Sequence, residues 1–96
     1  MPAVTRIGDD DVAHCSPMTR AVGSGNVYVN NKPVSRQSDP NTAHAGPGCV
    51  THNDVITAGS GTVKVNDLGC GRIGDDVGGL NCTSVAAGSA DVFAGG

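Results

Sequence analysis

The fold of this chain is decided by residues 23–39, GSGNVYVNNKPVSRQSD, because most of this stretch recurs at residues 59–75 as GSGTVKVNDLGCGRIGD. The two copies share Gly, Ser, Gly, Val, Val, Asn, Arg and Asp at matching positions. The spacing from Ser24 to Arg36 equals the spacing from Ser60 to Arg72. An internal repeat constrains the architecture more strongly than any single motif, so it is the first feature to interpret.

Each copy is typical of a small β-hairpin. Val27 and Val29 are two positions apart, as are Val63 and Val65, so both valines of a pair point to one face of an extended chain and predict a half-buried strand. Asn or Asp follows each pair, and these residues tolerate the left-handed backbone of a tight turn. A second extended run then leads to an Arg-x-x-Asp tetrad. We expect the Arg and the Asp of each tetrad to bond each other or neighbouring carbonyls.

A third unit is divided between the two ends of the chain. Residues 3–9, AVTRIGD, match the second half of a unit, and residues 88–93, GSADVF, match the first half. We therefore predict that the two ends meet in space and pair as strands. Three quasi-equivalent units would then close on themselves and leave few exposed sheet edges. The predicted fold is a single all-β domain spanning residues 1–96.

The composition predicts a core of small side chains. The 96 residues include 15 Gly, five Pro, one Tyr, one Phe and no Trp. Such a core stabilises a small domain weakly, so we expect an additional crosslink, either a structural zinc or two disulfides among the four Cys. The first nine residues lack the apolar segment of a signal peptide, so we expect synthesis in the cytoplasm, where thiols stay reduced. For Cys15, Cys49 and Cys70 the expected role is that of a small core residue or an incidental thiol.

Charge and hydropathy exclude several classes of partner. A net charge of −3, with only six Lys and Arg, argues against a nucleic-acid partner. No stretch is apolar enough over sufficient length to predict a membrane span. The acidic run at residues 9–11 is expected to be a solvated turn.

The segments between the units contain every His of the chain. They are expected to be connecting loops, at residues 10–22, 40–58 and 76–87. His14 and His44 each lie five residues after the Asp of a tetrad, and Cys82 lies seven residues after its Asp. Quasi-threefold placement would bring these three side chains to one axis, and His52 lies further along the longest loop.

Three His and one Cys satisfy the four-coordinate preference of zinc. The predicted ligands are therefore His14, His44, His52 and Cys82, with one zinc per chain. The spacing of His44, Cys49 and His52 would also suit a local half-site, so a set that uses Cys49 or Cys15 stays open.

A filled shell of four protein ligands predicts a structural zinc, because a catalytic zinc keeps one position for water. Ser24 and Ser60 lie in the repeat strands rather than beside a His, and their Gly-Ser-Gly segments open strands instead of helices. We therefore expect no enzyme activity and no small-molecule substrate. Two alternatives remain, a small zinc hydrolase and a calcium-binding β-roll. The β-roll hypothesis is weakened because the first two units have Asn26 and Thr62 at the position of Asp91, and so lack the carboxylate that would bind calcium.

The repeat resembles the PAAR-repeat family. The pattern Gly-Ser-x-x-Val-x-Val/Ile-Asn-x-x-Pro-x-x-Arg-x-Gly-Asp occurs in three units and covers nearly the whole chain. The Pro-Ala-Ala-Arg that gives the family its name corresponds here to PVSR at residues 33–36, GCGR at 69–72 and PAVTR at 2–6, which has one extra residue. Within the family, the chain is most similar to the spike-tip proteins of contractile phage tails.

The resemblance implies both a shape and a role. It implies a small pointed cone of three β-hairpin repeats with pseudo-threefold symmetry and a zinc near the apex. It also implies a structural cap on a trimeric β-helical spike, one copy per trimer, because three units can meet three identical subunits. Such a cap sharpens the tip that pierces a membrane, which it contacts transiently. The expected location is the tail tip of a phage virion or a type VI secretion apparatus, and the sequence does not distinguish the two.

Overall fold

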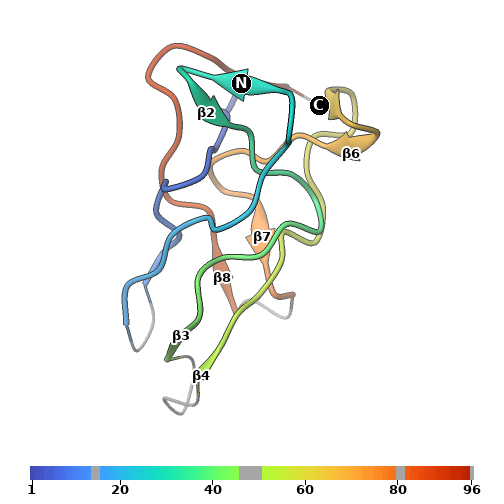
Figure 1. The fold of residues 1–96 in the computed structure, drawn as a ribbon. Helices are drawn as coiled ribbons and strands as arrows, with labels where there is room; N and C mark the ends of the chain where they lie inside the picture. The colour runs from blue at the N-terminus through green and yellow to red at the C-terminus, as the bar shows by residue number, and fades with distance from the viewer. Residues whose placement is uncertain (14–15, 46–50, 80–81, 96) are drawn as a thin grey trace.

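The computed structural model describes residues 1–13, 16–45, 51–79 and 82–95. These residues form an all-β structure of short antiparallel hairpins, with no helix among them (Figure 1). The described strands are β1 (Tyr28–Val29), β2 (Lys32–Pro33), β3 (His44–Ala45), β4 (Thr51–His52), β5 (Lys64–Val65), β6 (Leu68–Gly69), β7 (Asp76–Val77) and β8 (Thr83–Ser84). They pair as β1 with β2, β3 with β4, β5 with β6 and β7 with β8. The described chain contains no helix that could cross a membrane.

The two hairpins predicted from the repeat are confirmed. β1 pairs with β2 through Val29 and Lys32, and β5 pairs with β6 through Val65 and Leu68. Both turns consist of two residues with positive φ, Asn30 and Asn31 at 54° and 65°, and Asn66 and Asp67 at 52° and 66°. Asn and Asp adopt this backbone at lower cost than other side chains, which explains why they follow the valines in both copies.

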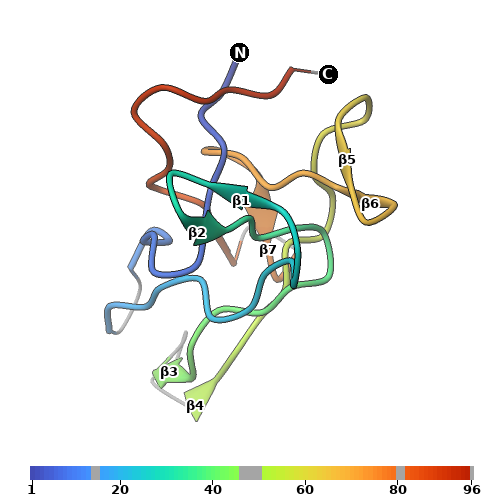
Figure 2. The same ribbon diagram turned by 45° about the horizontal axis from the view of Figure 1, so that its top comes forward.

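The predicted pairing of the two ends is also confirmed. Ala3 and Phe93 form an antiparallel bridge, and the Val4 N–H donates to the Val92 carbonyl at 3.0 Å. The Ala94 N–H donates to the Pro2 carbonyl, also at 3.0 Å. Both termini accordingly lie at the same end of the molecule in two views (Figures 1 and 2). The divided unit is thus completed by the two ends of the chain.

The three units are joined by a closed triangle of backbone hydrogen bonds. Thr5 N–H donates to the Gly71 carbonyl at 3.0 Å, Gly71 donates to Ser35 at 3.0 Å, and Ser35 donates back to Thr5 at 3.1 Å. A Cβ at Gly71 would lie only 2.5 Å from the Ser35 carbonyl oxygen, so the close approach requires glycine. Each unit contributes one donor and one acceptor, which makes the three units equivalent at this level.

The Arg-x-x-Asp tetrads form ion pairs within each unit, as predicted. The shortest contacts between guanidinium and carboxylate are 2.8 Å for Arg6 and Asp9, 2.8 Å for Arg36 and Asp39, and 2.9 Å for Arg72 and Asp75. The same three arginines also reach a neighbouring unit through Nη1, with acceptors Asn30 Oδ1 (2.9 Å), Asn66 Oδ1 (2.9 Å) and the Gly95 carbonyl (3.0 Å) respectively. The carboxylate hydrogen bond raises the pKa of each arginine.

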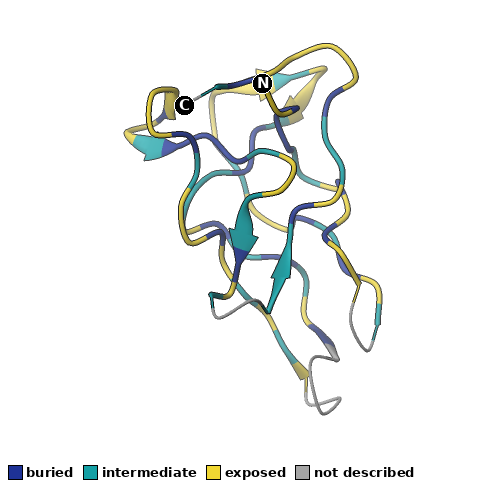
Figure 3. Cartoon of the chain, turned by 180° about the vertical axis from the view of Figure 1, so that it is seen from behind, coloured by how far each residue is buried: buried dark blue, intermediate teal, exposed yellow. Residues whose placement is uncertain are grey.

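The core consists of small side chains, as expected. One buried cluster contains Val4, Val34, Val65, Cys70 and Ala94, with Val29 packed against it, and a second contains Ile56, Val77 and Val85. Figure 3 shows buried positions spread along the middle of the molecule rather than gathered in one layer. Cys70 is thus a core residue, whereas Cys15 and Cys49 lie outside the described residues.

The two valines of each pair differ in exposure, although the sequence pattern predicted that both lie on one face of a half-buried strand. Val27 is 36% exposed and Val63 is 40% exposed, while Val65 is buried and Val29 half-buried. β1 and β5 are only two residues long and begin after Val27 and Val63, so the first valine lies beyond the part of the strand that covers the core.

The predicted loops contain more regular structure than expected. β3 with β4 and β7 with β8 lie within two of them, and Asp10 and Thr19 form an antiparallel bridge in the first. Each segment turns back on itself, so its two arms satisfy each other's backbone donors and acceptors.

The acidic run at residues 9–11 is not a solvated turn. Asp10 is exposed, but Asp9 and Asp11 are 8% and 3% exposed. Asp9 is held by Arg6, and Asp11 forms a 2.8 Å ion pair with Arg20 in which both side chains are fully buried.

Candidate metal centre

Two histidines face each other across the β3–β4 hairpin. The register pairs His44 directly with His52, and directly opposed residues of an antiparallel pair have adjacent side chains. Their ring centroids are 4.5 Å apart, with an angle of 60° between the ring planes. The hairpin lies at the end of the molecule opposite the two termini (Figure 1).

A carboxylate completes the group. Asp54 lies two residues beyond His52, and its Oδ2 is 3.1 Å from His52 Nδ1. The ligand atoms of His44, His52 and Asp54 all lie within 4.8 Å of one another, so these three residues could hold a metal ion. Asp54 was not predicted from the sequence, although the His-x-Asp spacing places both side chains on the same side of an extended segment.

The hydrogen bonds fix how the histidines present their nitrogens. His44 Nδ1 is 2.6 Å from the Thr42 carbonyl oxygen, which can only accept, so Nδ1 carries the proton. In the neutral imidazole the lone pair is then on Nε2. His52 Nδ1 faces a carboxylate in the same way. An Nδ1 bonded to a carbonyl or a carboxylate is typical of metal-binding histidine, because the outer contact orients the ring and raises its basicity.

Cys82 lies next to the same carboxylate. Its Sγ donates a hydrogen bond to Asp54 Oδ2 at 3.4 Å. Burial raises the pKa of the Cys82 thiol, and the hydrogen bond to Asp54 and the negative charges of Asp54 and Asp76 raise it further. The sulfur therefore keeps its proton at neutral pH unless a cation compensates the thiolate charge.

The predicted ligand set is thus brought together in part. His44 and His52 are in contact, and Cys82 reaches them through Asp54, which had not been predicted. His14 lies outside the described residues, as do Cys15 and Cys49. Imidazole nitrogen, carboxylate oxygen and thiolate sulfur are all ligands that zinc accepts, so the chemistry of the described donors fits that metal.

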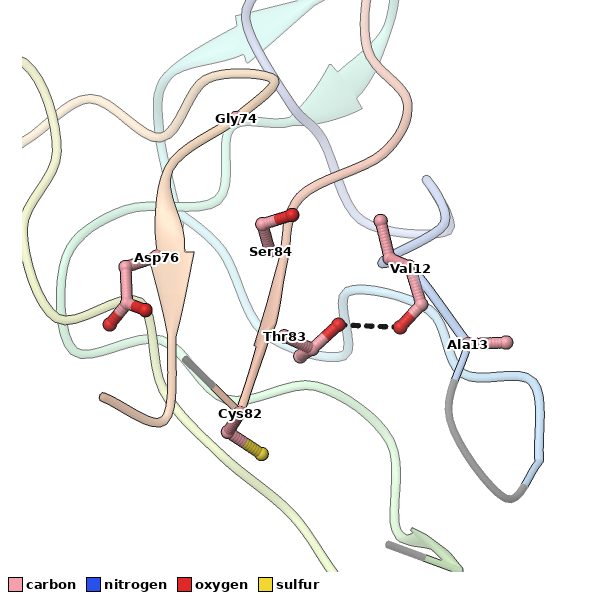
Figure 4. A pocket seen from close by; sticks show the side chains of 7 residues that line it. All are labelled: Val12, Ala13, Gly74, Asp76, Cys82, Thr83 and Ser84. Carbon is pink, nitrogen blue, oxygen red and sulfur yellow. Dashed lines mark hydrogen bonds between the residues drawn. The ribbon is translucent and has the colours of Figure 1, made fainter. Parts of the chain in front are cut away.

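A surface hollow of about 480 Å³ adjoins Cys82 (Figure 4). The residues that line it are Val12, Ala13, Gly74, Asp76, Cys82, Thr83 and Ser84. The Thr83 hydroxyl donates to the Val12 carbonyl at 2.5 Å, and Asp76 accepts from the Thr57 hydroxyl at 2.7 Å. Among the lining residues that the structure describes, none is a His.

The opposite end of the molecule exposes one valine from each unit. Val27, Val63 and Val92 occupy matching positions and are 36%, 40% and 37% exposed. The serine three residues before each valine accepts a hydrogen bond from its N–H, at 2.9, 2.8 and 3.0 Å respectively. The three valines thus share the same local backbone support. They adjoin β1, β5 and the carboxyl-terminal segment, which lie at the end that carries both termini (Figure 2). We call Val27, Val63 and Val92 the base valines.

In comparisons with known proteins, no family model matches the chain, and no curated protein matches it.

Proposed function

We propose that the protein is a spike tip of the PAAR-repeat type, a structural cap that binds the blunt end of a trimeric β-helical spike. The observation that carries the proposal is the threefold recurrence of one arrangement within a single chain. Each unit contributes one residue to the backbone triangle, one tetrad ion pair and one exposed base valine.

A trimeric partner explains why the recurrence is useful. A homotrimer ends in three identical surfaces, and a chain with three equivalent units can contact each of them once. The base valines offer apolar area at three matching points, and short strands nearby offer backbone groups for strand addition. The stoichiometry that follows is one chain per trimer.

At the other end, zinc would hold the apex together. His44 and His52 come from β3 and β4, and Cys82 directly precedes β8, so a shared ion would tie two hairpins to each other. His14 is the fourth ligand in this proposal, and Asp54 orients His52. The ion would supply folding free energy, which amounts to about 10–16 kcal/mol in small zinc domains. No open coordination position is needed, so the proposed role is structural rather than catalytic.

The cap would sharpen a contractile injection machine, either a phage tail or a type VI secretion apparatus. A cone with its metal-bound apex forward and its base on the spike would concentrate the driving force on a small area of membrane. The β3–β4 hairpin lies at the end of the molecule opposite β2 and β6, whose hairpins adjoin the base valines Val27 and Val63 (Figure 1). This role requires such an arrangement, with the metal centre and the spike-binding surface at opposite ends.

Binding to the spike encoded in the same genome tests the proposal. Val27→Asp, Val63→Asp and Val92→Asp each place a charge in the proposed interface, and Val55→Asp is the control, because Val55 is equally exposed at 40% and adjoins β4. We expect each base variant to weaken spike binding at least about tenfold, since a buried unpaired charge is costly, while the control binds as the native protein does. Native-like binding by all three base variants would contradict the proposal.

A further inference from the structure

A polar cluster is buried directly behind the candidate metal centre. Arg20, Asp11 and Asn41 are 1%, 3% and 1% exposed. Arg20 Nη2 donates to Asp11 Oδ2 at 2.8 Å, and Asn41 Nδ2 donates to the same oxygen at 3.0 Å. Arg20 Nη1 donates to the Asp39 carbonyl at 3.0 Å.

This cluster is a poor source of stability. Asp11 Oδ1 and Arg20 Nε are buried without a hydrogen-bond partner among the described residues. Burial raises the pKa of Asp11 and lowers that of Arg20, although the attraction between the two opposes both shifts. Buried ion pairs of this kind can often be replaced by apolar residues without loss of stability.

The other two units show that the fold does not need these charges. The backbone N–H groups of Arg20, Ile56 and Val85 donate to the carbonyls of equivalent residues, the tetrad aspartates Asp9, Asp39 and Asp75. Arg20 therefore takes the place of Ile56 and Val85. By the same register, Asp11 and Asn41 each lie two residues after a tetrad Asp, where the unit of residues 59–75 is followed by Val77. Ile56, Val77 and Val85 form an ordinary apolar cluster.

Asn41 connects the cluster to the metal centre. Its backbone N–H donates to the Asp54 carbonyl at 2.9 Å, and its side-chain Oδ1 accepts from the Asp54 N–H at 2.8 Å. Asp11, as a carboxylate, can only accept, so it holds the Nδ2 end of the Asn41 amide and turns Oδ1 towards Asp54. Asp54 in turn contacts His52 Nδ1 and Cys82 Sγ.

We propose that Asn41, with its amide oriented by the buried Asp11 and Arg20 pair, is a positioning residue of the metal centre. It fixes the backbone at Asp54 and thereby the carboxylate that orients His52 and meets Cys82. This inference rests on the proposed metal binding. It also gives a role to the fully buried ion pair of Asp11 and Arg20, whose counterparts in the unit of residues 59–75 are Val77 and Val85.

The experiment compares Zn²⁺ and Co²⁺ binding by the full chain and three variants. Asn41→Ala removes the acceptor of the Asp54 N–H. Asp11→Val with Arg20→Val copies the apolar pattern of Val77 and Val85, which follow the unit of residues 59–75, and leaves Asn41 in place. Val34→Ala is the control, because Val34 is 1% exposed in the other buried cluster, with Val4 and Val65, so its truncation opens a cavity in the core without removing a contact of Asn41 or Asp54.

We expect Asn41→Ala to bind Zn²⁺ about 10–100-fold more weakly than the native protein and to change the Co²⁺ absorption spectrum. The double variant should lose about tenfold in affinity while its metal-free form melts no lower than the native one. Val34→Ala should melt lower but keep the native affinity and spectrum. Native affinity together with a native Co²⁺ spectrum in Asn41→Ala would overturn the inference.

Failure of the proposed metal function can be distinguished from failure of the positioning role. If the native chain binds neither ion, the proposed metal function fails, and the positioning role is read from the metal-free protein. We then expect faster amide exchange at Asp54 and shifted imidazole ¹⁵N resonances of His52 in Asn41→Ala, but not in Val34→Ala. Unchanged exchange and resonances would overturn the positioning role.

Discussion

Replacing one tetrad arginine by alanine tests whether the three units are energetically equivalent. In the native protein Arg36 donates through Nε and Nη2 to Asp39 at 2.8 and 3.1 Å, and through Nη1 to Asn66 at 2.9 Å. Arg36→Ala removes all three contacts. It leaves the Asp39 carboxylate, whose side chain is only 7% exposed, with the Arg36 backbone N–H at 2.9 Å.

The expected loss is large for so small a domain. Removing one partner of a buried ion pair costs about 3–5 kcal/mol, and partial exposure of Arg36 favours the lower value. A loss of about 3 kcal/mol corresponds to a fall in melting temperature of about 12–24 °C in a domain of this size. Arg6→Ala and Arg72→Ala remove corresponding contacts and should cost nearly the same.

Thermal and urea unfolding of the three variants, followed by circular dichroism under identical metal conditions, measure these losses. Lys64→Ala is the control, because it removes an exposed cation from β5, and it should leave the melting temperature unchanged. A cost below about 1 kcal/mol for Arg36→Ala would place the pair among ordinary surface salt bridges and refute the reasoning. One variant with a far smaller cost than the other two would show that its unit is not equivalent.

Deleting residues 88–96 removes the strand that pairs with the amino terminus and should abolish or badly weaken folding, so an unchanged melting temperature would contradict the closed arrangement. A circular permutant joins the two ends of the chain and opens the β5–β6 turn, so that another unit becomes the divided one. If the units are equivalent, the permutant should keep the native circular dichroism spectrum, and an unfolded permutant would argue against equivalence. Zinc must displace the proton of Cys82, whose pKa is raised, so zinc affinity should increase as pH rises through neutrality. Cys82→Ser should bind zinc weakly, and its zinc binding should release one proton fewer. If titration gives the same pH profile for Cys82→Ser and the native protein, Cys82 is not a ligand.

The parts of the structure that recur in the sequence were the parts that could be predicted. The Asn turns, the tetrad ion pairs and the pairing of the ends all follow from aligning one unit with another. In each case the same residue types adopt the same local structure in different units, as Asn30 and Asn66 do with their positive φ. Each of these three predictions could therefore be checked in one unit against the sequence of another.

Two features that occur in one unit alone escaped prediction, the burial of Asp11 and the place of Asp54 beside the histidines. The acidic run could not be recognised as buried, because the partner of Asp11 is Arg20, a residue whose counterparts Ile56 and Val85 are apolar. Asp54 was missed for a related reason. Its role depends on the antiparallel pairing of β3 and β4, which was interpreted as a loop, and no other unit has a matching carboxylate to draw attention to it.

The central claim is that one chain presents three equivalent surfaces to a trimer, and the mass of the complex tests it most directly. Native mass spectrometry of the protein mixed in excess with its trimeric spike should give a single species of one chain per three spike subunits. Equal numbers of the two proteins in the complex, or no complex at all, would contradict the account.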